Sequence, residues 1–398
     1  MAVFQDLSVD LIYIIISHLQ SDKGSLQHIS LSCRLLRDIS QRFIVRHVTL
    51  AHSPTISKSK LFLRTLEERP DLRAHVHRLE LDLLREDAHW PEEQNNVNLL
   101  TRLLTNLREF RYLSRDYKSW HYSLPFPLKW ASENAHSQVR RVDWHHSMTI
   151  ETLWKCMELP RIETINCRDL LRACDSTEKA TAFDISTIPT SSSSVTDLGV
   201  GSASGLPLED FRLLLRSPRS LHKLCLEYRG KLHGSFEKDR IDWLLEPVQN
   251  TLQELSVSVA IGLESAADFS AFHALKKLYI PLIYLIGRYP DDTFRAKVLL
   301  PPRLCELAIL FTATDSTEAS SPYASRNAKA LTNWLEHFRV KMGQSTDLSL
   351  VTLDEAGFRS YHGDLCRSSV RAMDGVWGTL KNDIPIRLRL FHQLSMGE

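Results

Sequence analysis

One spaced pattern of apolar residues recurs through most of the chain: an apolar residue, two others, an apolar residue, one other, and a third apolar residue. Successive copies begin 23 to 33 residues apart, as Val139 to Ile162 and Ile162 to Val195 illustrate. The last two apolar positions are two residues apart, so they lie on one face of a short strand. A repeat of this kind predicts stacked units rather than one closed core. The nine copies begin at Val76, Leu107, Val139, Ile162, Val195, Leu221, Leu252, Leu275 and Leu304.

Helical patterns separate several of these copies, so each unit is expected to be a short strand with a return helix. Such units bury their apolar faces only against their neighbours, which predicts an α/β fold of short parallel strands in a curved solenoid. The pattern resembles the leucine-rich repeat, although the Asn or Cys that this family has after the strand is largely missing. A doubly wound sheet is the alternative, and it is disfavoured because no glycine-rich phosphate loop follows a strand. The helical patterns cover residues 61–68, 97–104, 150–157, 208–216 and 241–248.

The predicted repeat body covers residues 51–345 and contains two insertions. Residues 184–205 include four consecutive serines and three glycines, and residues 312–326 are rich in Ser, Thr and Ala. Both insertions are expected to be mobile loops, and phosphorylation of the serine run is a less favoured reading than a solvated linker. A helix is expected over residues 329–342. Residues 346–398 are expected to cap the solenoid, with a fold that the pattern does not define.

The first 50 residues form a separate predicted module of three helices. Apolar residues recur every fourth position from Leu7 to Leu19, and Ser8 is a suitable helix cap. A second helix is expected to carry Leu26, Ile29 and Cys33 on one face, followed by a short helical turn over residues 39–44. A segment of about 45 residues cannot bury so much apolar surface within itself. Either a partner or the rest of the chain is expected to cover it.

The N-terminal residues carry a family resemblance. Residues 7–12 (LSVDLI), with Ile15, Leu19 and Leu26, and then residues 29–34 (ISLSCR) with residues 36–37 (LR) resemble the F-box motif. Ser8 stands where the family has Pro, and Asp10 where it has Glu. The resemblance implies binding to the Skp-type adaptor of a cullin-RING ubiquitin ligase of the SCF type. The adaptor-binding residues that it implies are Leu7, Ser8, Leu11, Ile15, Leu19, Leu26, Ile29 and Cys33.

Composition and motifs favour a protein that performs no bond chemistry. The formal net charge of +1 offers no general attraction to nucleic acid or to an anionic membrane. The seven cysteines are scattered singly and have no zinc-ligand spacing, so no metal site is expected. The glycines of residues 199–205 have the wrong spacing for a dinucleotide-binding loop. The basic and aromatic residues of 108–122 are interrupted by acidic residues, which disfavours a nucleic-acid-binding surface. No catalytic residue or cofactor is predicted, and neither a signal peptide nor a membrane span is expected, which favours the cytoplasm or nucleus.

Residues that alternate with the buried strand positions are expected to face the concave side of the solenoid and to contact a target protein. The sequence therefore predicts a non-catalytic substrate receptor, in which the N-terminal module binds the adaptor and the repeats bind the target. The alternative is a leucine-rich-repeat scaffold without a role in ubiquitin transfer. The candidate target-binding residues are Arg141, Asp143, His145, Lys223, Glu227, Lys277 and Tyr279.

Overall fold

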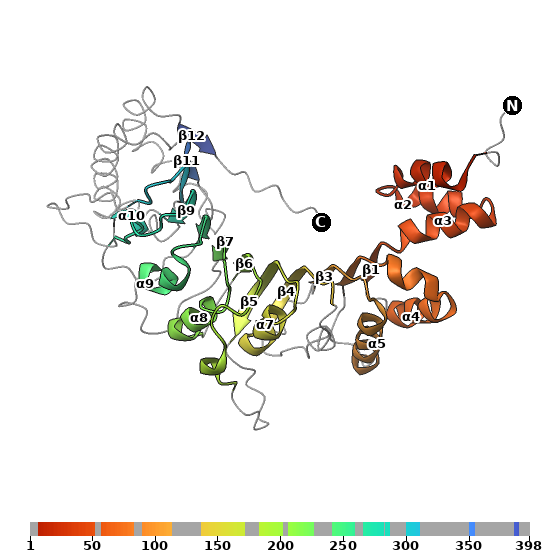
Figure 1. The fold of residues 1–398 in the computed structure, drawn as a ribbon, viewed down its shortest axis with the longest axis horizontal. Helices are drawn as coiled ribbons and strands as arrows, with labels where there is room; N and C mark the ends of the chain where they lie inside the picture. The colour runs from red at the N-terminus through yellow and green to blue at the C-terminus, as the bar shows by residue number, and fades with distance from the viewer. Residues whose placement is uncertain are drawn as a thin grey trace, which may run out of the picture. The chain divides into compact units, whose positions relative to one another are not determined.

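A computed structural model gives the fold of the chain (Figure 1). It contains α-helices and parallel strands, which confirms the predicted α/β class. The residues that the structure describes are 7–51, 57–82, 90–113, 137–171, 183–201, 206–226, 241–258, 266–281, 283–286, 300–310, 350–354 and 386–389.

Each of the nine sequence copies contains a strand. These strands are β2 (Arg78–Asp82), β3 (Glu109–Leu113), β4 (Arg141–Thr149), β5 (Thr164–Leu171), β6 (Asp197–Val200), β7 (Lys223–Leu226), β8 (Glu254–Val257), β9 (Lys277–Pro281) and β10 (Glu306–Leu310). Three more strands lie outside the nine copies: β1 (His47–Ala51), β11 (Leu350–Asp354) and β12 (Ile386–Arg389).

The described helices follow the same order along the chain. The N-terminal helices are α1 (Val9–Ser17), α2 (Lys23–Ser30) and α3 (Arg34–Ile44). The later ones are α4 (Lys58–Glu68), η2 (Pro70–His75), α5 (Trp90–Leu103), α7 (Ile150–Met157), η3 (Ile185–Thr187), α8 (Leu208–Leu215), α9 (Ile241–Leu245), η4 (Glu246–Val248) and α10 (Ile283–Ile286). All five predicted helical patterns are therefore helical, and residues 150–157 match α7 in both bounds.

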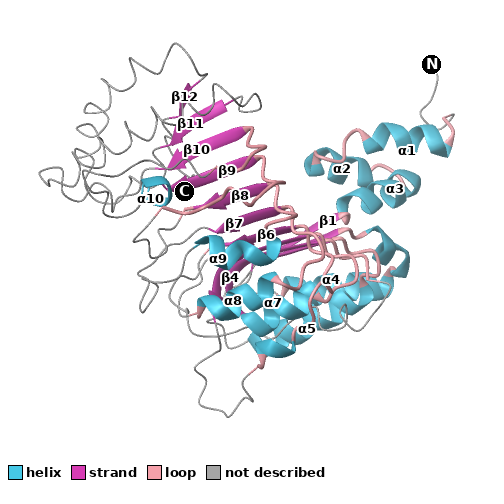
Figure 2. Cartoon of the chain, turned by 60° about the vertical axis from the view of Figure 1, so that its left-hand side comes forward, coloured by secondary structure: helices cyan, strands magenta, loops and turns pink. Residues whose placement is uncertain are grey.

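The chain divides into two compact units, and the division falls near residue 170. The first unit holds α1–α3 and most of the strands β1 to β5, and its strands lie side by side in chain order. Helices α4, α5 and α7 lie along one side of these strands (Figure 2). The second unit holds β6 to β12, again in chain order, and β11 and β12 extend its parallel ladder where a cap without defined fold was expected.

The repeat pattern sets the register of the strands. In both units the second apolar position of a copy pairs with the same position of the next copy, as Leu79 does with Phe110 and Leu224 with Leu255. Just before strands β1 to β4 and β6 to β9, one carbonyl accepts two N–H groups from the next repeat: the Arg46 carbonyl accepts from His77 and Arg78, each at 3.0 Å. The apolar positions of the pattern are almost fully buried between strands and helices, with Leu79, Leu224 and Leu255 at 0 % exposure. Backbone pairing and side-chain burial therefore select the same alignment.

Three local predictions need correction. The second helix was expected to carry Cys33, but α2 ends at Ser30 and Cys33 is the residue before α3. Residues 39–44 belong to the eleven-residue helix α3 and are not a separate turn. Strand β1 crosses residue 50, the predicted end of the N-terminal module.

The serine run differs from its prediction as a mobile loop. Ser193 is only 2 % exposed, and its hydroxyl donates to the Met157 carbonyl at 2.7 Å. The Ser194 hydroxyl donates to the Ile162 carbonyl, also at 2.7 Å. The prediction is wrong for these two residues because their hydroxyls satisfy carbonyls of the preceding repeat. Residues 202–205, the second insertion at 312–326 and the helix expected over 329–342 lie outside the described residues.

Candidate functional site

The N-terminal helices bury one small core and leave a second apolar surface in solvent. The core consists of Ile12 and Ile16 from α1, Leu26 from α2, and Ile39 and Phe43 from α3. Ser8 caps α1, and its hydroxyl accepts from the Leu11 N–H at 3.3 Å. Asp22 caps α2 in the same way and accepts from the Ser25 N–H at 3.1 Å. The side-chain caps thus set where both helices begin.

The second apolar surface gathers most of the large hydrophobic side chains that are exposed in the described part of the chain. Seven of those nine side chains belong to residues 9–35. We call the five on α1 the α1 face; their exposed fractions lie between 41 and 55 %, and they are Val9, Leu11, Tyr13, Ile14 and Ile15. The other two, Leu31 and Leu35, lie at the junction of α2 and α3 and are 83 and 42 % exposed. A group of this size on a short helix is typical of a surface that binds another protein.

The predicted adaptor-binding residues divide into three groups in the structure. Ser8, Leu11, Ile15 and Cys33 are exposed. Leu7, Leu19 and Ile29 are partly buried and pack against the small core. Leu26 is fully buried in that core, so it stabilises the module and offers no surface to a partner.

The predicted list also missed five exposed apolar side chains, namely Val9, Tyr13, Ile14, Leu31 and Leu35. A signal for those on α1 was present in the sequence, because Ile14, Ile15 and Ile16 are consecutive. Three consecutive residues cover about 200° of a helix, which is more than one apolar stripe. Such a helix needs apolar contacts on two sides, and the core of the module supplies only one.

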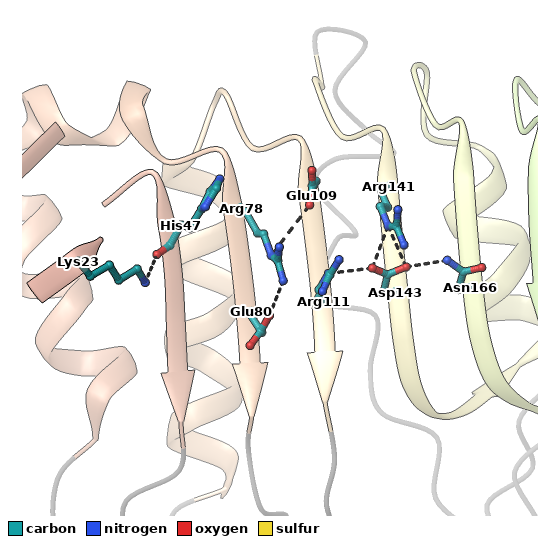
Figure 3. A network of polar contacts seen from close by, with 9 residues as sticks. All are labelled: Lys23, His47, Arg78, Glu80, Glu109, Arg111, Arg141, Asp143 and Asn166. Carbon is teal, nitrogen blue, oxygen red and sulfur yellow. Dashed lines mark hydrogen bonds and ion pairs between the residues drawn. The ribbon is translucent and has the colours of Figure 1, made fainter. Parts of the chain in front are cut away.

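A second candidate site is the polar face of the strands in the first unit (Figure 3). Its centre is Asp143 on β4, a carboxylate whose side chain is 4 % exposed. The Arg141 Nε donates to both carboxylate oxygens, at 2.9 and 3.1 Å, and the Asn166 amide donates at 2.7 Å. The Arg111 Nε lies 2.8 Å from the same carboxylate and forms an ion pair with it. Burial alone would raise the pKa of Asp143, but these hydrogen bonds and the two positive charges outweigh burial and lower it.

Charges also pair across the neighbouring strands of the first unit. The Arg78 guanidinium lies 2.8 Å from Glu80 on the same strand and 3.9 Å from Glu109 on the next one. At the free edge of β1, the Lys23 ammonium donates to the His47 carbonyl at 2.8 Å. This contact ties α2 to the first strand and satisfies an edge carbonyl.

The second unit carries a simpler ladder of the same kind. Lys223 lies 2.5 Å from Glu254, and Lys277 lies 4.0 Å from both Glu254 and Glu306. These residues occupy matching positions on β7, β8, β9 and β10. Opposite charges therefore alternate from strand to strand, and such cross-strand pairs stabilise a sheet.

The predicted target-binding residues are mostly engaged in these pairs. Arg141, Asp143, Lys223 and Lys277 have partners within their own unit. His145 is exposed on β4, and Tyr279 on β9 is half-buried. Glu227 lies outside the described residues. Those on β4 belong to the first unit, and those on β7 and β9 belong to the second.

Other kinds of site were also considered for the described residues. These residues contain no group of three or more His, Cys, Asp or Glu side chains arranged to hold a metal ion. None of the helices among them has both the length and the apolar character needed to cross a bilayer. Neither a protein-family model nor a curated protein matches the chain. The candidate site therefore rests on the geometry of the α1 face and of the strands.

Proposed function

We propose that this protein is a substrate receptor of an SCF-type ubiquitin ligase, with α1–α3 binding a Skp-type adaptor and the repeats holding a target protein. The observation that carries the proposal is the α1 face. Leu11, Ile14 and Ile15 remain about half exposed although the same helix already buries two isoleucines in the small core. Tyr13 is 41 % exposed and also packs on the Phe43 ring, with the ring centroids 4.9 Å apart. Together with the F-box resemblance of the sequence, this surplus apolar surface favours a protein partner over cover from the chain itself.

In this proposal the chain itself forms and breaks no bonds. A receptor raises the effective concentration of its target beside the ligase component that transfers ubiquitin. The mechanism then requires two separate surfaces on one chain. Within the first unit, the Lys23 hydrogen bond to the His47 carbonyl and the Asp38–Arg69 ion pair of 3.6 Å link the N-terminal helices to the elements that follow.

The alternative is a scaffold in which the N-terminal helices make only internal contacts. That alternative requires another element to cover the α1 face. Among the described residues, Leu11 and Ile15 are 49 and 44 % exposed, so no such element covers them. The exposure of these two side chains therefore favours the receptor.

Retention of the adaptor tests the proposal. Tagged full-length protein is mixed with a purified Skp-type adaptor, and the dissociation constant is measured for the wild type and for Leu11→Glu with Ile15→Glu. About half the surface of each side chain is still exposed, and burying it against a partner contributes about 1 kcal/mol of binding free energy per side chain. Losing both contacts, about 2 kcal/mol, weakens binding roughly thirtyfold.

The chain offers a matched control for this double variant. Leu61 on α4 and Leu99 on α5 are also exposed leucines, at 52 and 38 %. Leu61→Glu with Leu99→Glu introduces the same two charges on helices away from α1 and should leave adaptor affinity unchanged. The proposal fails if wild-type protein does not retain the adaptor, or if both double variants bind it equally well. Circular dichroism of each variant verifies that α1–α3 still fold.

A further inference from the structure

A row of basic residues in the first unit has no counterpart in the second unit. The row occupies the second position of the repeat pattern, immediately before the strand: Arg46 before β1, His77 before β2, Arg108 before β3 and Arg140 before β4. It ends at β5, where the same position is the acidic residue Glu163. In the second unit the same positions, before β6 to β10, are Thr196, His222, Gln253, Lys276 and Cys305. Only two of those five, His222 and Lys276, are basic, and the neutral Gln253 separates them from each other.

Backbone hydrogen bonds hold the four basic residues side by side. The N–H of His77 donates to the Arg46 carbonyl at 3.0 Å, that of Arg108 to the His77 carbonyl at 2.8 Å, and that of Arg140 to the Arg108 carbonyl at 2.8 Å. Neighbouring strands lie about 4.8 Å apart, so the row extends over about 14 Å. We call these four residues the basic row.

The basic row has few anionic partners in the described residues. Within the described part of the chain, the Arg46 guanidinium donates to two neutral groups, the Gln20 side chain at 3.1 Å and His77 Nδ1 at 3.2 Å. Arg108 is exposed and makes no ion pair with a described residue. Arg140 pairs with Glu163 at 3.2 Å, with both side chains about half exposed. The row thus carries more positive charge than its surroundings neutralise.

The surroundings of His77 support this view. Partial burial lowers the pKa of His77, and Arg46, Arg108 and two neighbouring histidines lower it further. Partial burial also lowers the pKa of His75 beside the row; Arg42 on α3 lowers it further, and Asp71 acts in the opposite direction. The charges of Arg42, Arg46 and Arg108 therefore reach the histidines at this end of the strands.

From this arrangement we infer that the basic row binds an acidic segment of a protein partner, a segment of about four or five extended residues that carries Asp, Glu or other anionic side chains. The length follows from the 14 Å row and a rise of about 3.3 Å per extended residue. This inference rests on the proposed function, because the segment would belong to the target. A nucleic acid is disfavoured, because single-stranded binders stack bases on exposed aromatic side chains. Among the exposed large hydrophobic side chains of the described residues, the one aromatic is Tyr13, which lies on α1 and not in the basic row.

Binding of a fluorescein-labelled ten-residue polyglutamate peptide to the full-length protein tests the inference. Fluorescence anisotropy should detect binding that weakens as salt increases, because exposed charges are screened. Arg108→Glu should reduce the affinity about tenfold, since it removes one attraction and adds one repulsion. Lys276→Glu makes the same charge change at the same repeat position of the second unit, and it should leave the affinity unchanged.

Three results would overturn the inference: no binding of polyglutamate to the wild type, equal losses in the two variants, or tighter binding of a mixed-sequence single-stranded RNA that Arg108→Glu also weakens. Adaptor affinity measured on the same samples separates this test from that of the proposed function. Arg108→Glu should keep its affinity for the adaptor, whereas Leu11→Glu with Ile15→Glu should bind the adaptor roughly thirtyfold more weakly and still bind the peptide. A failure of the proposed adaptor binding and a failure of the proposed peptide binding can then be told apart.

Discussion

Removing the Asp143 carboxylate should locally destabilise the first unit. Asp143→Ala removes the carboxylate that accepts hydrogen bonds from Arg141 and Asn166 and forms an ion pair with Arg111. Removing one partner of a fully buried ion pair costs about 3–5 kcal/mol. The lower end applies here, because the Arg111 and Arg141 side chains are 28 and 42 % exposed and water can reach them. We therefore expect a loss of about 3 kcal/mol.

Hydrogen exchange measured by mass spectrometry is the suitable assay, because a chain with two compact units need not unfold in a single step. A loss of about 3 kcal/mol corresponds to a roughly hundredfold fall in amide protection in β4 and its neighbours. Glu163→Ala is the matched control, since Glu163 also pairs with an arginine of the first unit but is 53 % exposed. Its loss should change protection less than about fivefold.

The reasoning fails if Asp143→Ala and Glu163→Ala reduce protection equally. The pH dependence gives a second check on the same carboxylate. The folded state lowers the pKa of Asp143 below the ordinary value of 3.8, so the unfolded chain binds its proton more readily. The stabilisation by Asp143 is complete above the unfolded pKa and is lost as pH falls through the folded pKa. In Asp143→Ala this part of the acid sensitivity should disappear.

Two further predictions concern titratable groups. Partial burial, and after it the charges of nearby arginines, lower the pKa of His47 and His77 below 6.5. Amide protection in β1 and β2 should therefore fall as pH drops below about 6.5. An equal fall in β9 and β10 would contradict this assignment. Burial raises the pKa of the Cys156 thiol, and that of Cys167 to about 12, whereas Cys33 is exposed. Iodoacetamide should therefore modify Cys33 in the native protein and reach Cys156 and Cys167 only after denaturation, as peptide mass mapping would show.

The strands were predictable because their signal is local. Three apolar residues in fixed spacing are sufficient, and all nine copies became strands. Strand β1 fits the same pattern, with Val45, Val48 and Leu50, but it was missed because these residues were assigned to the N-terminal module. Strand β12 does not fit, since Asp383 stands at the first apolar position, although Ile386 pairs with Val351 in register. Its place depends on the preceding strand rather than on its own pattern.

The orientation of α1 was harder to predict, and helix geometry gives the reason. Residues four apart are rotated by about 40° relative to each other, so three such steps from Leu7 to Leu19 amount to about 120°. These residues cannot share one face. In the structure Leu7 and Leu19 pack toward the core, while Leu11 and Ile15 face solvent. Which face is buried is decided by contacts with Leu26 and other core residues of α2 and α3, and that information is not local.

Stacking of parallel strands constrains charges as strictly as it constrains apolar residues. Two like unit charges about 5 Å apart in water repel by about 0.8 kcal/mol, and each strand brings its charge next to that of its neighbour. At the first residue of each strand, the second unit avoids this cost by alternation, as Lys223, Glu254 and Lys277 illustrate. One position earlier, the first unit keeps Arg108 beside Arg140, and only the end of the row has an acid, Glu163, which pairs with Arg140. An anionic ligand would remove that repulsion, and for this reason the basic row, rather than the paired charges beside it, is the part of the strand edge suited to a partner.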